Sequence, residues 1–200
     1  MAGGRFEFNF NDGIFNLDDH EIVRVVYTHP NQESRLYEYC NLNGLVCYLP
    51  LKKVWRPMAQ RHGGKVYRYP KVVLRPMFPS YMFVKLTVGQ RALLYNSNAI
   101  VRILHDADQN QGRLLDDIRV VRQIEAIAQS EAVEFNAEIK EGSKFLIESG
   151  PWQGIYGWLK KKQSRFVWTV EIECVSTIVQ ATIDPSKYRM TPVEEPCAPR

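Results

Sequence analysis

Apolar and polar positions alternate with a period of two over several short stretches, and segments with helical spacing separate them. Residues 21–28 (EIVRVVYT) are β-branched and apolar, so they predict a strand. In residues 31–44 the positions Leu36, Tyr39/Cys40 and Leu42 share one helical face, and Gly44 supplies a stop. Residues 45–76 then predict a long hairpin, whose extended arms join through a polar turn at 58–64.

The stretch at 80–86 (SYMFVKL) predicts another strand with two distinct faces. Met82, Val84 and Leu86 share one face, and Tyr81, Phe83 and Lys85 share the other. A short helix at 88–97, a short strand at 98–104 and a longer helix at 115–130 complete the pattern. This order of strands and helices predicts an α+β domain over residues 21–129, in which helices flank an antiparallel sheet.

A second, smaller domain is predicted after an acidic linker at 130–140, which shows no apolar period. Residues 141–192 contain short strands near 144–148, 154–160, 165–173 and 177–183, punctuated by glycines, and predict a small all-β barrel. Residues 1–20 and 193–200 are expected to be terminal tails.

Charge is segregated along the chain, although the net charge is only +4. From Tyr39 to His105 there is no aspartate or glutamate. Eleven basic residues occupy the same window: Lys52, Lys53, Arg56, Arg61, Lys65, Arg68, Lys71, Arg75, Lys85, Arg91 and Arg102. Such a block attracts polyanions, nucleic acid above all; the alternative is a solvated surface with chance clustering.

Several function classes find no support in the sequence. Neither an apolar run of about 20 residues nor a secretory signal occurs, so a cytoplasmic protein without membrane contact is expected. The four cysteines, Cys40, Cys47, Cys174 and Cys197, lack zinc-site spacing and are expected to be reduced thiols. Paired carboxylates in the basic window, a nucleophile elbow and a phosphate-binding glycine loop are also missing. We therefore expect no enzyme, cofactor or metal.

Three motifs resemble parts of one family. Residues 141–159 (EGSKFLIESGPWQGIYGWL) resemble a KOW motif, which ribosomal proteins also carry. Residues 25–51 resemble the strand–helix–strand opening of a NusG N-terminal (NGN) domain, W-Y-x-x-x-T-x-x-x-x-E…L…G-x-x-x-Y-x-P. Residues 75–86 (RPMFPSYMFVKL) resemble that domain's aromatic signature. In this order the motifs cover residues 21–192, and the chain is identified as a member of the NusG/RfaH family of transcription elongation and antitermination factors.

Two positions depart from the family pattern. Val23 or Arg24 replaces the usual tryptophan of the first strand, and Cys174-Val175-Ser176 replaces the Gly-Arg before the last barrel strand. The FPSYMF core and the N-terminal tail favour a specialised paralogue over the housekeeping factor. The Gly-Pro-Trp turn at 150–152 predicts a permanent barrel, unlike the refolded helical KOW segment of RfaH.

The resemblance implies that the NGN domain binds the clamp helices of RNA polymerase through an apolar pocket. Tyr27, Phe78, Tyr81 and Phe83 are its candidates, and Pro76 and Pro79 would fix the direction of the strand; burial of both faces under helices is the alternative. Contact with the non-template DNA strand is implied for the nearby polar residues. These are His29, Asn31, Gln32 and Arg35, with Arg91, Asn96, Asn98 and Arg102 as a second group.

The KOW domain is implied to recruit partners through a projecting loop. Trp152 and Ile155 would contact the termination factor Rho or a small-subunit ribosomal protein, unless the tryptophan caps the barrel core instead. The expected function is that of a monomeric factor that bridges the polymerase cleft and suppresses pausing. A ribosome-associated or RNA-binding KOW protein is the alternative function.

Overall fold

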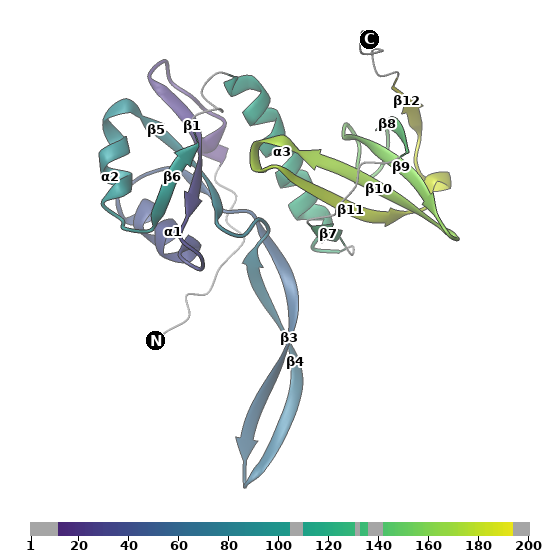
Figure 1. The fold of residues 1–200 in the computed structure, drawn as a ribbon, viewed down its shortest axis with the longest axis horizontal. Coiled ribbons are helices and arrows are strands. Elements are labelled where there is room, and N and C mark those ends of the chain that lie inside the picture. The colour runs from purple at the N-terminus through teal and green to yellow at the C-terminus, as the bar shows by residue number, and fades with distance from the viewer. Residues whose placement is uncertain (1–11, 105–109, 131–132, 136–141, 194–200) are drawn as a thin grey trace. The chain divides into compact units, whose positions relative to one another are not determined.

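The computed structural model describes residues 12–104, 110–130, 133–135 and 142–193 (Figure 1). The chain forms two compact units, residues 1–109 and 110–200. The division falls before the long helix that we expected at the end of the first domain, so this helix groups with the second unit. Residues 1–11 and 194–200 of the two expected tails lie outside the described residues.

The first unit is built on a four-stranded antiparallel sheet with the order β2-β5-β1-β6. Its strands are β1 (Glu21–Thr28), β2 (Cys47–Tyr48), β5 (Tyr81–Thr87) and β6 (Ile100–Leu104). Its helices are α1 (Glu33–Leu42) and α2 (Arg91–Tyr95), with single 3-10 turns η1 (Asp12–Ile14) and η2 (Val88–Gln90). The predicted strand at 21–28 is confirmed to the residue.

One face of this sheet forms the core with α1 and α2. Val26 of β1 and Met82, Val84 and Leu86 of β5 are at most 1 % exposed and pack in one cluster with side chains of both helices, among them Leu36. Full burial of such a side chain contributes about 1.5–3 kcal/mol. The predicted inward face of the 80–86 strand is therefore confirmed.

A long two-stranded hairpin extends from the same unit, formed by β3 (Leu51–His62) and β4 (Lys65–Pro76) (Figure 1). The strands pair without a register shift over their whole length and turn at Gly63 and Gly64, whose φ angles are 56° and 78°. Positive φ at both turn residues is the requirement of a type I′ hairpin. The predicted hairpin is confirmed, but the predicted turn at 58–64 is too long because pairing continues to His62.

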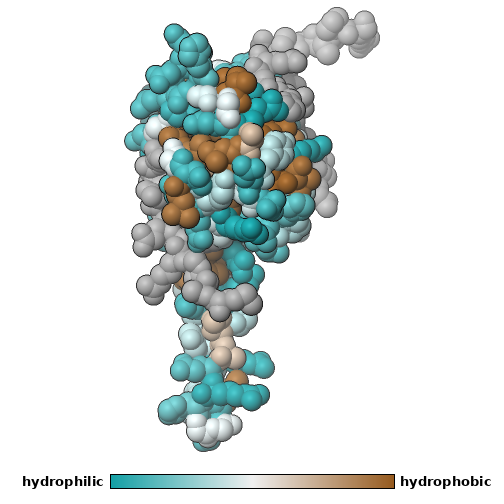
Figure 2. Space-filling model, turned by 90° about the vertical axis from the view of Figure 1, so that its left-hand side faces the viewer, coloured by the Kyte–Doolittle hydropathy of each residue, from teal (hydrophilic) through white to brown (hydrophobic). Residues whose placement is uncertain are grey.

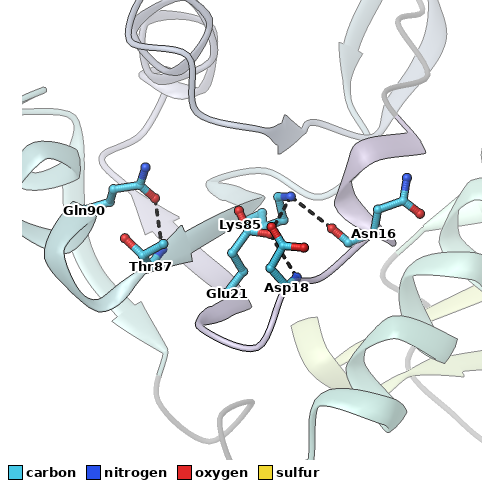
Figure 3. A network of polar contacts seen from close by, with 6 residues as sticks. All are labelled: Asn16, Asp18, Glu21, Lys85, Thr87 and Gln90. Atoms are coloured by element: carbon cyan, nitrogen blue, oxygen red, sulfur yellow. Dashed lines mark hydrogen bonds and ion pairs between the residues drawn. The ribbon is translucent and has the colours of Figure 1, made fainter.

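A polar network ties the segment before β1 to β5 (Figure 3). The Lys85 ammonium donates to the Glu21 carboxylate at 2.8 Å and to the Asn16 carbonyl at 3.0 Å. The Asp18 amide also donates to Glu21, at 3.2 Å. These bonds, with Lys85 first, lower the pKa of Glu21 below its ordinary value of 4.5. The described part of the N-terminal tail is thus ordered on β5.

The second unit contains α3 (Gln111–Ile127) and a six-stranded sheet with the order β12-β8-β9-β10-β11-β7. The strands are β7 (Val133–Phe135), β8 (Ser143–Ile147), β9 (Tyr156–Lys162), β10 (Arg165–Ile172), β11 (Thr177–Ile183) and β12 (Met190–Pro192). The 3-10 turns η4 (Glu173–Val175) and η5 (Pro185–Lys187) lie between them. Four of these strands were predicted; β7 contradicts the linker prediction at 133–135, because it pairs with β11.

Helix α3 is held to this unit by specific bonds. The Cys174 amide donates to the Asp117 carboxylate at 2.9 Å, and Arg113 pairs with Glu173 at 2.6 Å. These contacts join the helix to η4. A hydrogen bond and an ion pair therefore connect α3 to the second unit with which it is grouped. Within the part of the chain that the structure describes, no helix is long and apolar enough to cross a membrane.

Candidate functional site

Three loops of the first unit meet at one end of the sheet. The Thr28 amide donates to the Ser80 carbonyl at 2.8 Å, and the His29 amide donates to the Ala99 carbonyl at 2.9 Å. We call this place the corner and define it as residues 28–33, 78–81 and 96–99. Backbone bonds fix its loops to one another, which gives polar side chains on them a rigid support.

A buried carboxylate organises the turn at 78–81. The Ser80 amide donates to Glu33 at 2.7 Å, and both residues are buried, with 8 % and 6 % exposure. Ser80 has a φ of 67°, a left-handed conformation that is costly for serine and needs support from its surroundings. The Tyr81 amide closes the turn onto the Phe78 carbonyl. Glu33 therefore sets the conformation from which Tyr81 starts β5.

An aromatic row runs across three strands beside the corner. Tyr27 of β1 lies opposite Tyr81 of β5 and opposite Arg102 of β6 in the sheet register. The two tyrosine rings meet edge to face with centroids 5.1 Å apart, and the Arg102 guanidinium lies 5.8 Å from the Tyr27 centroid. Both rings are half-buried and Arg102 is exposed. This row joins two predicted polymerase-binding residues to one predicted DNA-binding residue.

The other two predicted polymerase-binding rings are buried. Phe83 is 0 % exposed and stacks on Tyr48 at 5.9 Å, and Phe78 is 2 % exposed. The expectation that Phe83 lies on an accessible face with Tyr81 is therefore wrong in this structure. The physical reason is that Phe83 occupies the middle of a central strand, where aromatic packing removes it from water, whereas Tyr81 begins the strand.

Five of the predicted nucleic-acid-binding residues belong to the corner. The bond from His29 to Ala99 brings the first loop next to the 96–99 loop. Asn31 and Asn98 adopt φ angles of 61° and 53°, which asparagine tolerates better than most residues. Four of the five side chains are exposed and Gln32 is half-buried. The five are His29, Asn31, Gln32, Asn96 and Asn98.

Two predicted residues lie outside the corner. Arg35 is exposed on α1 after the corner ends, and Arg91 starts α2 at the end remote from the 96–99 loop. The charge of Arg91 acts instead on Arg24, whose pKa is lowered by burial first and by this neighbouring positive charge second. The guanidiniums of Arg35 and Arg91, which both lie on helices, add to the positive potential on the helix-bearing face of the sheet.

The predicted partner-binding loop of the second unit does not project its tryptophan. Trp152 is 0 % exposed and Ile155 is 1 % exposed, so the prediction of an exposed aromatic there is wrong. The turn is clamped from outside, because the Gln123 side chain of α3 donates to the carbonyls of Pro151 and Gln153, both at 2.8 Å. The carbonyls on both sides of Trp152 are thus bonded to α3, and the tryptophan ring itself is a core residue.

Of the described thiols, Cys40 and Cys47 are buried and Cys174 is half-buried. The pKa of Cys47 is raised by a hydrogen bond with Cys40 and then by burial, and the pKa of Cys174 is raised mainly by burial. Such thiols stay protonated at neutral pH. Among the described residues, histidine, cysteine, aspartate and glutamate form no group of three that could hold a metal ion.

Sequence reasoning missed Glu33 and Ser80 as determinants of the site. A signal was present, since Thr28 and Glu33 match the T-x-x-x-x-E part of the NGN pattern. What the pattern could not tell is that the carboxylate reaches a backbone amide 47 positions away in the chain. A buried acid at the start of a helix is otherwise indistinguishable from an exposed first-turn acid.

Comparison with known families agrees with this architecture. A family model described as "Transcription termination factor nusG" matches residues 24–123, which is 100 of the 200 residues. No curated protein shows a significant match to the chain. The matched segment begins within β1 at Arg24 and contains the rest of the first unit's sheet, the hairpin, the corner and the aromatic row. The chain therefore belongs to the NusG family of transcription elongation and antitermination factors.

Proposed function

We propose that this chain binds the clamp helices of RNA polymerase through Tyr27 and Tyr81 and suppresses transcriptional pausing. NusG-family factors bind RNA polymerase and act without enzymatic chemistry, so differential binding to polymerase states is the mechanism. The observation that carries the proposal is the aromatic row. Two adjacent, half-buried tyrosines offer large apolar area at low entropy cost, which is typical of interface anchors.

Phe83 and Phe78 take a supporting role in this proposal. Phe83 packs against Tyr48 beneath the sheet surface, and Phe78 anchors the turn that begins β5. Their burial keeps the two tyrosines in fixed positions, so less entropy is lost when a helical partner docks. This rigid support replaces the direct contact that the sequence suggested for both phenylalanines.

The corner is proposed to contact the non-template DNA strand of the elongation complex. His29, Asn31 and Asn98 supply exposed polar groups that can bond to phosphates or to an unpaired base. Arg102 links the two surfaces because it is exposed and lies over the Tyr27 ring. Its guanidinium is free to pair with phosphate along its outer edge while its inner face stacks on tyrosine.

The second unit is proposed to be a KOW barrel that recruits a partner such as Rho or a small-subunit ribosomal protein. With Trp152 and Ile155 in the core, recruitment must use other side chains. Tyr156, which begins β9 two residues after Gly154, is 53 % exposed and is the proposed anchor. We also propose that the chain is a specialised paralogue, on the basis of its FPSYMF segment and its N-terminal tail.

A polymerase-binding and elongation experiment tests the main proposal. Wild type, a Tyr27→Ala/Tyr81→Ala variant and a Tyr95→Ala control would be compared for binding to core polymerase and for pausing on a template with one strong pause site. Tyr95 is a matched control because it is an exposed tyrosine of the same unit, on α2. A hot-spot tyrosine is worth about 2 kcal/mol, so the double variant is expected to bind at least about thirtyfold more weakly.

The proposal fails if the double variant and the control alter pausing as the wild type does. A pull-down from the host lysate is a second test, because it distinguishes the two candidate functions. Recovery of ribosomes with core polymerase absent would favour a ribosome-associated KOW protein over a polymerase-bound factor.

A further inference from the structure

The hairpin of β3 and β4 carries exposed side chains that the sheet core does not explain. Every residue from 55 to 72 is exposed. Among the described residues, the hairpin is anchored at its base: Leu51 is 3 % exposed in the core cluster, and the Met77 amide donates to the Pro50 carbonyl. Twelve paired residues at about 3.3 Å each give the ribbon a reach of roughly 40 Å. An element of this length with no core of its own presents both faces to solvent.

The charge of the hairpin has one sign. Residues 51–76 contain no aspartate or glutamate, and in the space-filling view the lower part of the hairpin is mostly hydrophilic, with some apolar side chains interspersed (Figure 2). A positive field without internal neutralisation is complementary to a polyanion. The eight basic residues are Lys52, Lys53, Arg56, Arg61, Lys65, Arg68, Lys71 and Arg75.

Large apolar side chains lie among these cations. Trp55, Tyr67 and Tyr69 are 69 %, 55 % and 44 % exposed, although rings of this size are usually buried. Exposed rings on a water-facing ribbon cost free energy unless they have a partner. Among the described residues no core surrounds these rings, so a partner that covers them would come from outside the hairpin.

The strand register puts rings and cations on one face in a defined order. Paired residues of an antiparallel ladder share a face, and every second pair returns to it. The pairs of this face, which we call the stacking face, run from base to tip as follows: Arg56–Lys71, Met58–Tyr69, Gln60–Tyr67 and His62–Lys65. Two adjacent tyrosines are thus bracketed by basic pairs on both sides.

This order suits a single strand better than a duplex. Bases in a duplex stack on one another, so their faces are hidden from a protein ring, whereas unpaired bases can stack on successive aromatic side chains. The bracketing cations would contact the phosphates on either side of the stacked bases. An acidic protein surface would use the cations but leave the two tyrosine faces without a comparable partner.

We propose that the stacking face of the hairpin is a binding site for single-stranded nucleic acid, separate from the corner and from the aromatic row. Tyr67 and Tyr69 stack on two neighbouring unpaired bases, and the basic pairs at each end hold the backbone. Stacking and phosphate contacts do not use the ribose 2′-hydroxyl, so RNA and DNA single strands bind alike. The site does not depend on the clamp-binding proposal, because it uses a different element of the first unit.

Fluorescence anisotropy with the full chain tests the proposal. The probes are fluorescein-labelled twelve-nucleotide oligo-U, oligo-dT and a twelve-base-pair DNA duplex at fixed salt. Wild type is expected to bind the two single strands within about threefold of each other and more tightly than the duplex. Loss of two stacked bases in a Tyr67→Ala/Tyr69→Ala variant is expected to weaken binding at least about tenfold.

Two further variants examine charge and length. Lys65→Gln/Lys71→Gln, which removes one cation from each bracketing pair, is expected to flatten the slope of log K against log salt by about 1.4, because each phosphate contact contributes about 0.7 for single strands. A shortened hairpin, in which Asn-Gly replaces residues 57–70 and joins the pair Arg56–Lys71, is expected to bind as weakly as the tyrosine variant. The Asn-Gly turn closes this remaining ladder.

Matched controls remove the same groups elsewhere. Tyr95→Ala deletes an exposed tyrosine, and Arg165→Gln/Lys187→Gln deletes two exposed cations; both are expected to bind within about twofold of wild type. Equal binding by wild type and the shortened hairpin overturns the proposal, and so does tighter binding of the duplex. Loss of binding in the charge variant but not in the tyrosine variant also overturns it. Polymerase binding by the shortened hairpin, measured in parallel, separates this result from the clamp proposal.

Discussion

Replacing Glu33 by alanine tests how the corner is held together. The substitution removes the carboxylate that accepts the Ser80 amide at 2.7 Å, in a place where both residues are buried. Alanine offers no acceptor at this position. The Ser80 amide is then left without its bond inside the protein while Ser80 keeps a left-handed φ of 67°.

The expected cost follows from two terms. An unsatisfied buried donor costs about 1–3 kcal/mol, and loss of a negative charge in the first turn of α1 costs about 0.3–1 kcal/mol. Part of this destabilisation is offset, because the variant no longer has to desolvate a buried carboxylate when it folds. We therefore expect Glu33→Ala to lower the free energy of unfolding of the first unit by about 2 kcal/mol. Glu33→Gln keeps an oxygen acceptor and is expected to cost about 1 kcal/mol.

Urea denaturation of the full chain measures these values. The NMR amide signals of β1 residues report the first unit separately, so unfolding of the second unit does not confuse the transition. With an m value of about 1–3 kcal/mol/M, a loss of 2 kcal/mol shifts the midpoint by roughly 0.7–2 M. Glu38→Ala, an exposed acid on the same helix, is the matched control and is expected to change the midpoint little.

Amide hydrogen exchange at Ser80 is an independent test of whether Glu33 holds the turn at 78–81. Its amide is expected to be protected in wild type and in Glu33→Gln, and to exchange faster in Glu33→Ala. The reasoning is refuted if Glu33→Ala unfolds at the same urea concentration as Glu38→Ala and leaves Ser80 exchange unchanged. Such a result would mean that the turn at 78–81 keeps its conformation without the carboxylate.

Three other substitutions or conditions have expected outcomes. Gly157→Ala would place a Cβ 2.5 Å from the Thr169 carbonyl oxygen, so it is expected to destabilise the second unit by at least about 1–3 kcal/mol in thermal or urea unfolding; a neutral effect would contradict the close strand approach. Trp152→Ala is expected to cost about 3–5 kcal/mol, and an unchanged unfolding midpoint would mean that the ring is not a core residue. Because the folded-state pKa of Glu21 is lowered, its bond to Lys85 stabilises the fold above pH 4.5 and is lost as the pH falls through the folded-state pKa. The difference in unfolding midpoint between wild type and Lys85→Met is therefore expected to shrink between pH 6 and pH 3, and a constant difference would contradict it.

Local patterns predicted the elements of the first unit well. The strand at 21–28 needed only its β-branched composition, and the buried face of Met82, Val84 and Leu86 followed from alternation alone. Alternation also placed Phe83 with Tyr81, but it could not tell that only one of them is buried. Which side chains a sheet face exposes depends on packing partners that are remote in the chain.

The errors in the second unit have the same origin. The spacing of α3 showed an apolar stripe but not the surface it would contact, and bonds to Cys174 and to the turn beside Trp152 join it to the β structure. An aromatic after Gly-Pro can point outward or inward at similar local cost. Gln123 bonds to the carbonyls on both sides of Trp152, and no short-range signal connects it to residue 152.

The two-stranded form of the hairpin has a consequence for the solubility of the chain. In the described part of the structure β3 and β4 pair only with each other, so each strand leaves one edge of backbone donors and acceptors open to water. Open edges on a long ribbon invite pairing with a second molecule, and lysines and arginines along the strands oppose this by mutual repulsion. A bound polyanion would cancel that repulsion, so a chain with an occupied hairpin would be more inclined to self-associate than an empty one.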